Sequence, residues 1–371
     1  MEIDIPFILF VSFATIAGIQ LFYYWGIFSR TFKKFKAVTP SDSGVSVIIC
    51  ARNDRAFLED NLPLILSQNH KNFEVIVVND GSSDGTIDFL DDLAKANSNM
   101  KVLHLDIDQR FHRGKKFAQT IGIKAAKHEL LVFTDADCKP ATEDWLNIMS
   151  GHMTSDKSIV LGVGNYRRKA SLTNWIIQLE TFHSLMLYIN CAMAKMPYMG
   201  VGRNLSYKRP LFFSVKGFAS HQHLLSGDDD LFVNETANKQ NTTVCIDPQA
   251  FTVSEPKHKL GQWMIQKKRH YSTGKMYKFK HRFILGLYSF SLLLYYVLGV
   301  LVVLDGSFLI PVLSIIGFRF LTQAIVLFRN MKVFDYLKYY WVFPFLDIGI
   351  LLIHIFIGVR GYFSKPLRWN Y

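Results

Sequence analysis

Two aspartates one residue apart, Asp135 and Asp137, follow directly on the apolar run at residues 130–133. A short run of this kind is typical of a buried strand, so the two carboxylates stand where a strand ends. Carboxylates in a cleft are costly to desolvate without a cation, and a hard divalent ion such as Mg²⁺ or Mn²⁺ binds oxygen ligands. Such an ion would neutralise a diphosphate leaving group. The alternative interpretation is a solvated loop whose aspartates cap a helix.

A second group of carboxylates, Asp228, Asp229 and Asp230, follows Gly227. Three adjacent acids repel one another, so we expect the pKa of at least one of them to be raised. A positioned carboxylate can accept the proton of an attacking hydroxyl group. The alternative is an acidic helix N-terminus, because a helix over residues 231–237 would stabilise aspartate there through its dipole. The two interpretations can hold for different members of the triplet.

The segment around the first acids alternates strands with helices. Apolar, β-branched runs predict strands, and helical spacing predicts the helices between them. The expected strands are residues 45–50, 74–78, 102–105 and 130–133, and the expected helices are residues 58–67, 86–96 and 115–127. This alternation indicates an α/β domain with parallel pairing and right-handed crossovers. Ligands bind such sheets beyond the carboxyl ends of the strands, where this chain has Arg52, Asp54, Asp80, Asp135 and Asp137.

Apolar segments near both ends of the chain predict membrane helices. Residues 5–28 are uncharged and long enough to cross a bilayer, and acidic residues precede them, so we interpret them as a retained anchor and not a signal peptide. A polar composition makes the last candidate the weakest, since it holds Pro344, Asp347 and His354. We therefore expect one N-terminal helix and two or three C-terminal helices, the candidates being residues 283–304, 307–328 and 339–359.

Positive charge lies beside these segments in a chain with a net charge of +12. Residues 257–282 hold nine Lys or Arg and no Asp or Glu, and the first segment is followed by Arg30, Lys33, Lys34 and Lys36. Because positive flanks stay cytoplasmic, we expect residues 37–256 in the cytosol and the N-terminus outside. Four simple spans would also put the C-terminal tail outside, although it carries Arg360, Lys365 and Arg368. Either the last segment does not cross the membrane fully, or the tail is an exception to the rule that positive flanks stay cytoplasmic.

The remaining composition excludes other classes of protein. The sequence has no zinc-ligand spacing and no basic helix with heptads, so nucleic acid is not an expected partner. The four cysteines are scattered singly and form no CxxC pair, so we expect reduced cytosolic thiols. The predicted parts of the chain are an anchor with its basic flank at 1–36, the α/β domain at 37–256, a basic interfacial segment at 257–282 and a transmembrane region at 283–371.

The motifs together resemble a known family. In chain order they are Asp80-Gly81-Ser82-Ser83-Asp84-Gly85-Thr86, Gly114-Lys115, Asp135-Ala136-Asp137, Gly227-Asp228-Asp229-Asp230 and Gln266-Lys267-Lys268-Arg269-His270. This series resembles the inverting family-2 glycosyltransferases of the GT-A fold over roughly residues 45–275. The flanking spans resemble the membrane-bound branch, which includes cellulose, chitin and hyaluronan synthases and lipid-linked sugar transferases. The resemblance implies a mixed, mainly parallel sheet and an integral protein of a bacterial inner membrane.

The resemblance also implies roles for individual residues. Asp229 matches the family's catalytic base and Asp228 the acidic residue before it, while Asp137 would hold the divalent metal on the diphosphate. The acceptor side would be formed by Gly202 and Asn204 in the loop before the acidic motif, and by His270. Binding of the nucleotide sugar, a UDP-sugar by expectation, would use Arg52, Asp54, Asp80, Lys115, Asp135, Gln266 and Arg269.

One residue departs from the family pattern. The family motif ends in Trp, which commonly stacks on a polymer's terminal sugar, whereas this chain has His270. A histidine stacks less well, and Trp263 is either a substitute or an interfacial anchor. We therefore expect one or few sugars to be added to a lipid-linked or membrane-proximal acceptor. The alternatives are a processive polysaccharide synthase of the hyaluronan or chitin type, a nucleotidyltransferase, and a non-catalytic membrane scaffold or transporter with a degenerate transferase domain.

Overall fold

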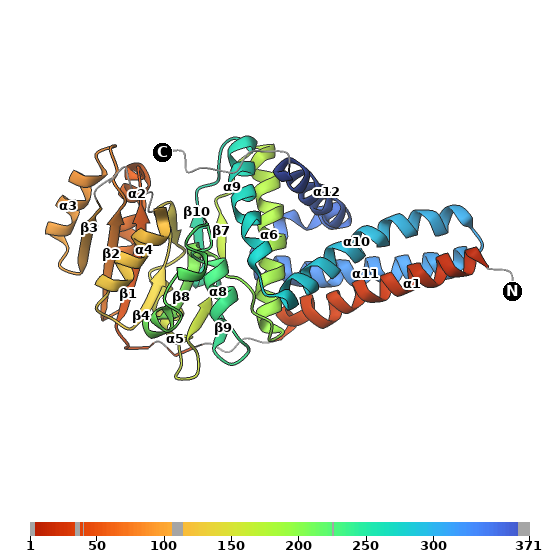
Figure 1. Ribbon diagram of the computed structural model, residues 1–371, viewed down its shortest axis with the longest axis horizontal. Helices are drawn as coiled ribbons and strands as arrows, with labels where there is room; N and C mark the ends of the chain where they lie inside the picture. The colour runs from red at the N-terminus through yellow and green to blue at the C-terminus, as the bar shows by residue number, and fades with distance from the viewer. Residues whose placement is uncertain (1–3, 34–37, 40, 106–113, 225, 363–371) are drawn as a thin grey trace.

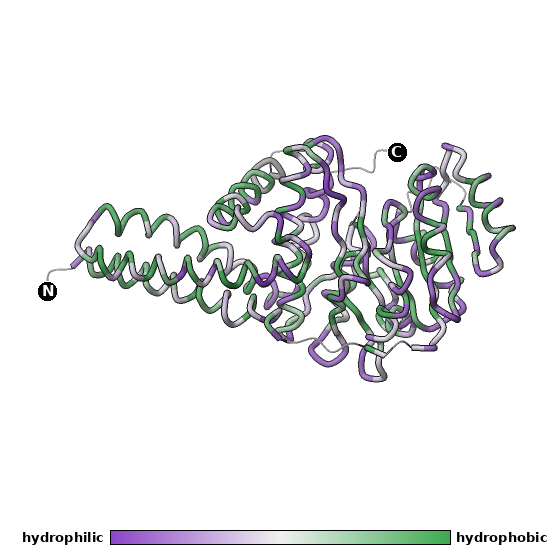
Figure 2. Tube along the Cα trace, turned by 180° about the vertical axis from the view of Figure 1, so that it is seen from behind, coloured by the Kyte–Doolittle hydropathy of each residue, from purple (hydrophilic) through white to green (hydrophobic). Residues whose placement is uncertain are grey.

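The structure is a computed structural model that describes residues 4–33, 38–39, 41–105, 114–224 and 226–362, with side chains to residue 357. Figure 1 shows a sheet-containing domain on one side and a bundle of long helices projecting from it on the other. Figure 2 shows that the projecting helices are coloured mainly as hydrophobic along their length. Large apolar side chains are exposed there, including Phe283, Ile310 and Leu304. Such a surface is stable only when lipid or protein covers it.

The main sheet of the domain has seven strands in the order β3-β2-β1-β4-β8-β6-β9. Strands β1 to β4 pair in parallel, β8 runs antiparallel to both β4 and β6, and β9 is parallel to β6. The sheet is therefore mixed and mainly parallel, as expected. The strands are β1 Val45–Ala51, β2 Phe73–Asn79, β3 Met100–His104, β4 Leu130–Phe133, β6 Ile159–Leu161, β8 Leu205–Lys208 and β9 Thr242–Val244.

The expected helices between the parallel strands are confirmed as α2 Arg55–Leu66, α3 Thr86–Ala96 and α4 Gly114–Ala125. The register pairs Ala51 with Asn79 and Ile48 with Phe133, so the strand ends of β1, β2 and β4 meet at one edge. A small second sheet was not anticipated, and its strands are β5 Cys138–Pro140, β7 Gly164–Tyr166 and β10 Thr252–Ser254. Strand β5 begins directly after the Asp135–Asp137 turn and so fixes where that turn ends.

A long helix that the sequence did not predict, α6 Leu172–Met193, separates the sheet domain from the membrane bundle (Figure 1). Most of its residues are buried on all sides, including Glu180, His183 and Asn190. Asn190 donates to the side chain of Asn330 in α11 at 2.8 Å, so polar contacts tie α6 to the bundle. The short helices α5 Trp145–Gly151, α7 Arg209–Ser214 and α8 Asp230–Thr236 complete the domain.

Four helical segments in the described residues are long and apolar enough to cross a membrane. The N-terminal one is α1 Ile5–Phe22, which continues through a π turn and a 3-10 turn to Phe32. The C-terminal ones are α10 Phe279–Asp305, α11 Leu309–Val333 and the segment Leu337–Ile357, which contains most of α12 Phe343–Tyr362. The protein is thus an integral membrane protein with one N-terminal and three C-terminal candidate spans.

Polar residues inside the bundle compensate one another. Arg319 of α11 and Asp347 of α12 form an ion pair at 2.5 Å, and both side chains are almost fully buried. The hydroxyl of Tyr24 donates to the same carboxylate at 2.9 Å. Charged groups at membrane depth are costly unless they pair in this way. Asp347, one of the polar residues that weakened the prediction of the last helix, is therefore paired inside the bundle.

Segment Leu337–Ile357 leaves the sheet domain and returns to it. Just before the segment, Asp335 pairs with Arg168 of the domain at 2.9 Å. A third of the way along, the carbonyl oxygen of Phe343 accepts a hydrogen bond from Gln323, near the middle of α11. At its end, Ile357 packs in one cluster with Trp263 and Tyr166. Figure 1 accordingly shows α12 lying obliquely at the base of the bundle formed by α1, α10 and α11. The tail residues Lys365 and Arg368 and the side chain of Arg360 lie outside the described part.

Candidate functional site

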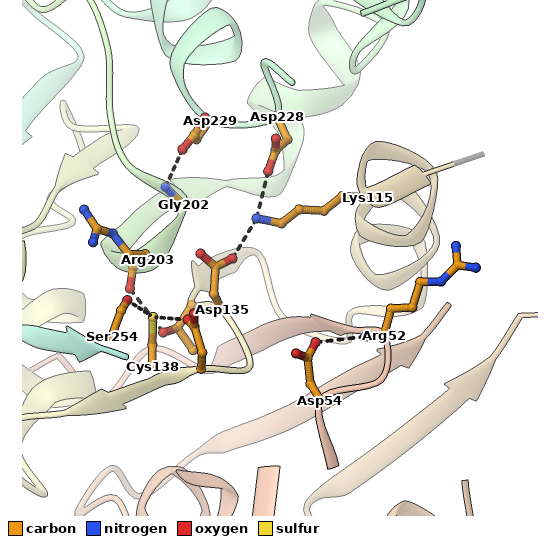
Figure 3. A network of polar contacts seen from close by, with 12 residues as sticks. Arg52, Asp54, Lys115, Asp135, Cys138, Gly202, Arg203, Asp228, Asp229 and Ser254 are labelled. Atoms are coloured by element: carbon orange, nitrogen blue, oxygen red, sulfur yellow. Dashed lines mark hydrogen bonds and ion pairs between the residues drawn. The ribbon is translucent and has the colours of Figure 1, made fainter. Parts of the chain in front are cut away.

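Lys115 joins the two groups of carboxylates that the sequence singled out. It lies in the first turn of α4, and its Nζ lies 2.6 Å from Asp135 and 3.1 Å from Asp228 (Figure 3). Burial opposes the charged form of this amine, but Asp135 and Asp228 outweigh burial and hold the pKa of Lys115 well above its usual range. The strand-end aspartate and the acidic triplet therefore face one site, although about ninety residues separate them in the sequence.

Asp229 accepts two backbone hydrogen bonds and carries no ion pair in the described structure. Its Oδ2 accepts from the amide of Gly202 at 2.7 Å, and its Oδ1 accepts from the amide of Asp230 at 2.7 Å. Burial and the neighbouring Asp228 and Asp230 raise the pKa of Asp229 to about 7. The expected rise is thus found, and the expected helix also begins here, because Asp229 is the N-cap of α8. A carboxylate with a pKa near 7 is matched to accepting a proton at neutral pH.

Asp230 points away from the other two acids and holds a different element. Its Oδ2 accepts hydrogen bonds from Thr273, at the end of helix α9 Leu260–Thr273, and from the hydroxyl of Tyr277 at 2.8 Å. Burial raises the pKa of Asp230, and these two hydroxyl groups partly offset that effect. Because α9 carries Gln266 and Arg269, Asp230 connects the loop of Asp229 to the helix that was expected to close over the donor. We infer that Asp230 is a positioning residue.

Replacement of Asp230 with asparagine should therefore lower the turnover number by about tenfold or more, because hydrogen bonds to a buried charge contribute about 1.5–3 kcal/mol. Tyr277→Phe removes only one of the two hydrogen bonds that Asp230 accepts from Thr273 and Tyr277, so it should lower the turnover number less. Turnover and the thermal unfolding midpoint are to be measured for both variants. If the loss of turnover in both variants were proportional to the decrease in the thermal unfolding midpoint, Asp230 would have a purely structural role.

The first carboxylate pair has the chemistry of a divalent cation site. Oxygen atoms of Asp135 and Asp137 and the sulfur of Cys138 all lie within 4.8 Å of one another. Burial and the neighbouring Asp135 raise the pKa of Asp137 to about 6, which shows that these carboxylates favour a nearby cation. The thiol of Cys138 is hydrogen-bonded to Ser254 at 2.7 Å, and burial raises its pKa well above the usual range. The residues therefore fit an oxygen-ligated Mg²⁺ or Mn²⁺, without a thiolate ligand.

A cavity of about 370 Å³ extends from these carboxylates to the membrane helices. Its sheet end is formed by Lys115, Asp135 and Asp229, and its far end by residues of α6, α10 and α12 such as His183, Tyr288 and His354. Of the residues expected in the site, it is lined by Lys115, Asp135, Gly202, Asp228, Asp229, Gln266, Arg269 and His270. The structure thus brings Asp229, the strand-end Asp135 and the helix of Gln266 and Arg269 around one space.

The residues expected around the nucleotide lie beside this cavity at the ends of β1 and β2. Asp54 accepts a hydrogen bond from the amide of Arg52 at 3.0 Å (Figure 3). The amide of Asp80 donates to the carbonyl oxygen of Ala51 at 2.9 Å. Burial raises the pKa of Asp80, and the charge of Arg52 lowers it in part. The pairing of β1 with β2 and β4 places these residues at the same edge of the sheet as Asp135. Burial raises the pKa of Asp54, and the charge of Asp135 contributes to that rise.

Asn204 does not lie where it was expected. Its side chain is fully buried, donates to the backbone of Val163 and Ala250 at 2.9 and 2.8 Å, and accepts from the indole of Trp145 at 3.1 Å. With its amide group engaged by the fold, it cannot contact an acceptor, and the acceptor assignment of Asn204 is wrong. The same loop contributes Val201 and Arg203 to the cavity lining, and the guanidinium group of Arg203 stacks on the ring of Tyr166 at 4.2 Å.

Helix α9 is anchored to α6 by contacts that the sequence did not reveal. Lys267 of α9 forms an ion pair with the buried Glu180 of α6, and both line the cavity. Trp263 is buried with Tyr166 and Ile177, so it is neither exposed to an acceptor sugar nor an interfacial anchor. The sequence signal for this contact was Glu180, the one Asp, Glu, Lys or Arg within residues 172–193, together with the basic residues of 257–282.

Comparison with known proteins identifies the domain. Residues 46–217 match the family described as glycosyl transferase family 2. The chain is 32% identical over 132 residues to a poly-beta-1,6-N-acetyl-D-glucosamine synthase of Staphylococcus epidermidis, covering 35% of this chain and 30% of that protein. It is 28% identical over 124 residues to an uncharacterized glycosyltransferase of Haemophilus influenzae, covering 33% and 36%. The chain thus spans about a third of the length of these relatives.

A solved structure resembles the whole chain. It is a mannosyltransferase from Pyrobaculum calidifontis in complex with GDP-Man and Mn²⁺, with a TM-score of 0.61 and 19% sequence identity, covering 97% of this chain and 99% of that one. At this identity the likeness shows the GT-A fold, and it includes the membrane helices as well as the sheet domain. The expected fold is therefore confirmed. Asp229, Gln266 and Arg269 lie beyond the residues that match the family, so their roles depend on the geometry described above.

Proposed function

We propose that this chain, a glycosyltransferase with a family 2 domain on the GT-A fold, transfers one or few sugars from a nucleotide-diphospho-sugar to a lipid-linked or membrane-proximal acceptor. We expect inversion at the anomeric carbon and a UDP-sugar as donor. A GDP-sugar is the alternative, since the mannosyltransferase of similar fold was solved with GDP-Man. The observation that carries the proposal is the cavity that joins Asp229 to the membrane helices.

The residues of the cavity divide the reaction between them. Asp229 accepts the proton of the acceptor hydroxyl as that oxygen attacks the anomeric carbon, and the amide of Gly202 holds the carboxylate in place. Lys115, Arg203 and Arg269 line the cavity and supply positive charge for the leaving diphosphate. A divalent ion on Asp137 would neutralise the same diphosphate. Inversion follows because the hydroxyl displaces the nucleotide in a single step.

A lipid-linked acceptor fits the position of the far end of the cavity. Tyr288 and Ser289 line it, and they lie about ten residues into α10, which corresponds to about 15 Å below the start of that helix. The approach to the site also carries the positive charge of residues 257–282, which would attract anionic lipid headgroups or an acceptor phosphate. An acceptor that enters from the membrane can therefore reach Asp229 with its polar end.

The length of the product tests this proposal. We expect the purified protein in lipid, with excess donor, to add one or two sugars, because His270 offers weaker stacking than Trp to the end of a polymer. His270→Trp should lengthen the product if stacking limits extension, and Tyr271→Trp is the neighbouring control. Product size is to be measured by mass spectrometry.

A processive synthase is the second candidate, and a specific observation favours it. The membrane end of the cavity is polar, with the Lys267–Glu180 ion pair, His183 and His354, and such a wall suits sugar hydroxyls. The relative from Staphylococcus epidermidis is a polysaccharide synthase by name. A ladder of products extending to high polymer would replace the first proposal with this one. A scaffold with a degenerate domain is disfavoured because the charged residues of the site are assembled around one cavity.

The membrane topology follows from the path of the last segment. We expect residues 37–256 and the C-terminal tail to be cytosolic and the N-terminus outside, because segment Leu337–Ile357 starts and ends at the sheet domain. A re-entrant segment of this kind would keep the basic tail on the cytoplasmic side. An impermeant thiol reagent applied to intact cells should label a cysteine engineered at Ser307, between α10 and α11. It should not label one at Asp92 or at Asn370, and labelling at either position would contradict this topology.

A further inference from the structure

A second cavity, of about 280 Å³, lies beside α4 and is not part of the site described above. One wall is a single face of α4, since Lys116, Thr120 and Lys124 follow one another at intervals of four residues. The opposite wall comes from α7 and the turn after it, with Phe213, Lys216 and Phe218. Aromatic rings and lysines thus face the same space, and none of the described residues that line it is acidic.

Lys116 is a buried cation that forms no ion pair with a carboxylate of the described residues. Its side chain is only slightly exposed, with 7% of the residue surface accessible, and its Nζ donates one hydrogen bond, to the carbonyl oxygen of His221. An ammonium group has three donors, so two remain for a ligand. Burial lowers the pKa of Lys116, and Asp228 and Asp230 offset this only in part. Buried charges in proteins are normally paired, so an anion bound in this cavity would be stabilised by Lys116.

The loop that follows α7 contributes to both cavities. Ala219 and Gln222 line the second cavity, and Asp228 and Asp229 line the first. Between them, a ring nitrogen of His221 is hydrogen-bonded to the carbonyl oxygen of Gly227 at 2.8 Å. Gly227 has a φ of +107°, a conformation that other residues rarely adopt. Contacts therefore run from Lys116 through His221 to the residue that precedes the acidic triplet.

We propose that this cavity binds a small organic phosphate monoester, which Lys116, Lys124 and Lys216 hold by charge while Phe213 and Phe218 pack on its apolar part. A phosphate monoester carries between one and a half and two negative charges at neutral pH, about what several lysines can neutralise. The volume of the cavity, about 280 Å³, leaves room for an aromatic ring beside the phosphate group. Because His221 contacts both Lys116 and Gly227, occupancy changes the turnover number more than the affinity for donor.

Phenyl phosphate is the probe for the binding site, measured by calorimetry on the full-length protein in lipid nanodiscs. Saturating UDP with Mn²⁺ is included to occupy the nucleotide site. We expect saturable binding that UDP does not displace and that benzyl alcohol, which lacks the charge, does not reproduce. In Lys124→Glu/Lys216→Glu the affinity should fall by more than about tenfold, whereas exposed lysines elsewhere, in Lys101→Glu/Lys239→Glu, should leave it unchanged.

Displacement by UDP, absence of saturable binding, or an equal loss in both double variants would overturn the site. The binding arm needs no enzymatic activity, so its failure is separate from failure of the proposed function. For the coupling, phenyl phosphate at saturating donor and acceptor should change the turnover number of the wild type and not that of Lys124→Glu/Lys216→Glu. A wild-type rate that stays constant when the site is saturated would reject the coupling.

Discussion

Replacement of Asp229 with asparagine is expected to lower the turnover number by about 10²–10⁴-fold, while the dissociation constant of the donor stays nearly unchanged. The carboxylate lies in the cavity, its two hydrogen bonds come from the backbone, and it forms no ion pair in the described structure. Removing a base slows the proton transfer but leaves ground-state donor contacts in place. Donor affinity is to be measured by calorimetry with the nucleotide and turnover by release of the nucleoside diphosphate.

Asp228→Asn is the matched control, because it makes the same replacement of a carboxylate by an amide at the adjacent residue. Asp228 is ion-paired with Lys115, which also contacts Asp135, so this variant should weaken donor binding as well as turnover. The two variants therefore separate a base from a charge that organises the donor site. If Asp228→Asn were inactive with normal donor affinity and Asp229→Asn were near wild type, the roles within the triplet would have to be exchanged.

The pH dependence gives an independent measure of the same residue. The pKa of Asp229 is raised to about 7 by burial and by Asp228 and Asp230, so the free enzyme loses its base as the pH falls below 7. We expect kcat/KM to fall by about tenfold per pH unit on the acid side of that value. A raised carboxylate pKa also means that the folded state loses stability as the pH rises from about 4 to 7. Asp229→Asn should thus unfold at a temperature equal to or above that of the wild type at pH 8.

The α/β half of the domain follows from local sequence signals. Strands β1, β2 and β4 are short runs rich in Val and Ile with helical spacing between them, and parallel pairing then places Asp80 and Asp135 at one edge. The strand predictions needed only chain order and the pairing rule, and the sheet confirms them. A raised pKa in the acidic triplet was expected from three adjacent charges, but burial, which the sequence does not record, is the larger cause at Asp229.

Other parts of the site depend on long-range packing that no local pattern records. Helix α6 is buried on nearly all sides, so its sequence lacks the polar face that marks an amphipathic helix. The sequence therefore did not predict the helix, or the contribution of its residues Glu180 and His183 to the cavity. Arg203 and Asn204 are adjacent, yet the fold turns one into the cavity and the other into the core. The packing of α12 likewise depends on partners that are distant in sequence, Arg319 of α11 for Asp347 and Trp263 for Ile357.

Removal of the divalent metal, or of its ligand by Asp137→Ala, is expected to abolish turnover. The diphosphate brings several negative charges to a site where Asp135 and Asp137 already lie close together. Without a divalent ion these charges repel one another, and the leaving group is not stabilised. We expect excess chelator to stop the reaction, added Mn²⁺ or Mg²⁺ to restore it, and nucleotide affinity in Asp137→Ala to fall by more than about a hundredfold, since metal ions at such sites contribute several kcal/mol.

Cys138→Ser tests whether the neighbouring thiol takes part. The thiol is hydrogen-bonded to Ser254, and its pKa is raised well above the usual range, so it stays protonated and is a poor ligand. A serine keeps the hydrogen bond and should leave metal affinity unchanged, which calorimetry with Mn²⁺ in the presence of nucleotide can measure apart from activity. Full turnover in excess chelator would show that Lys115, Arg203 and Arg269 alone neutralise the diphosphate. In that case the two strand-end carboxylates would serve to orient Lys115, whose Nζ already lies 2.6 Å from Asp135.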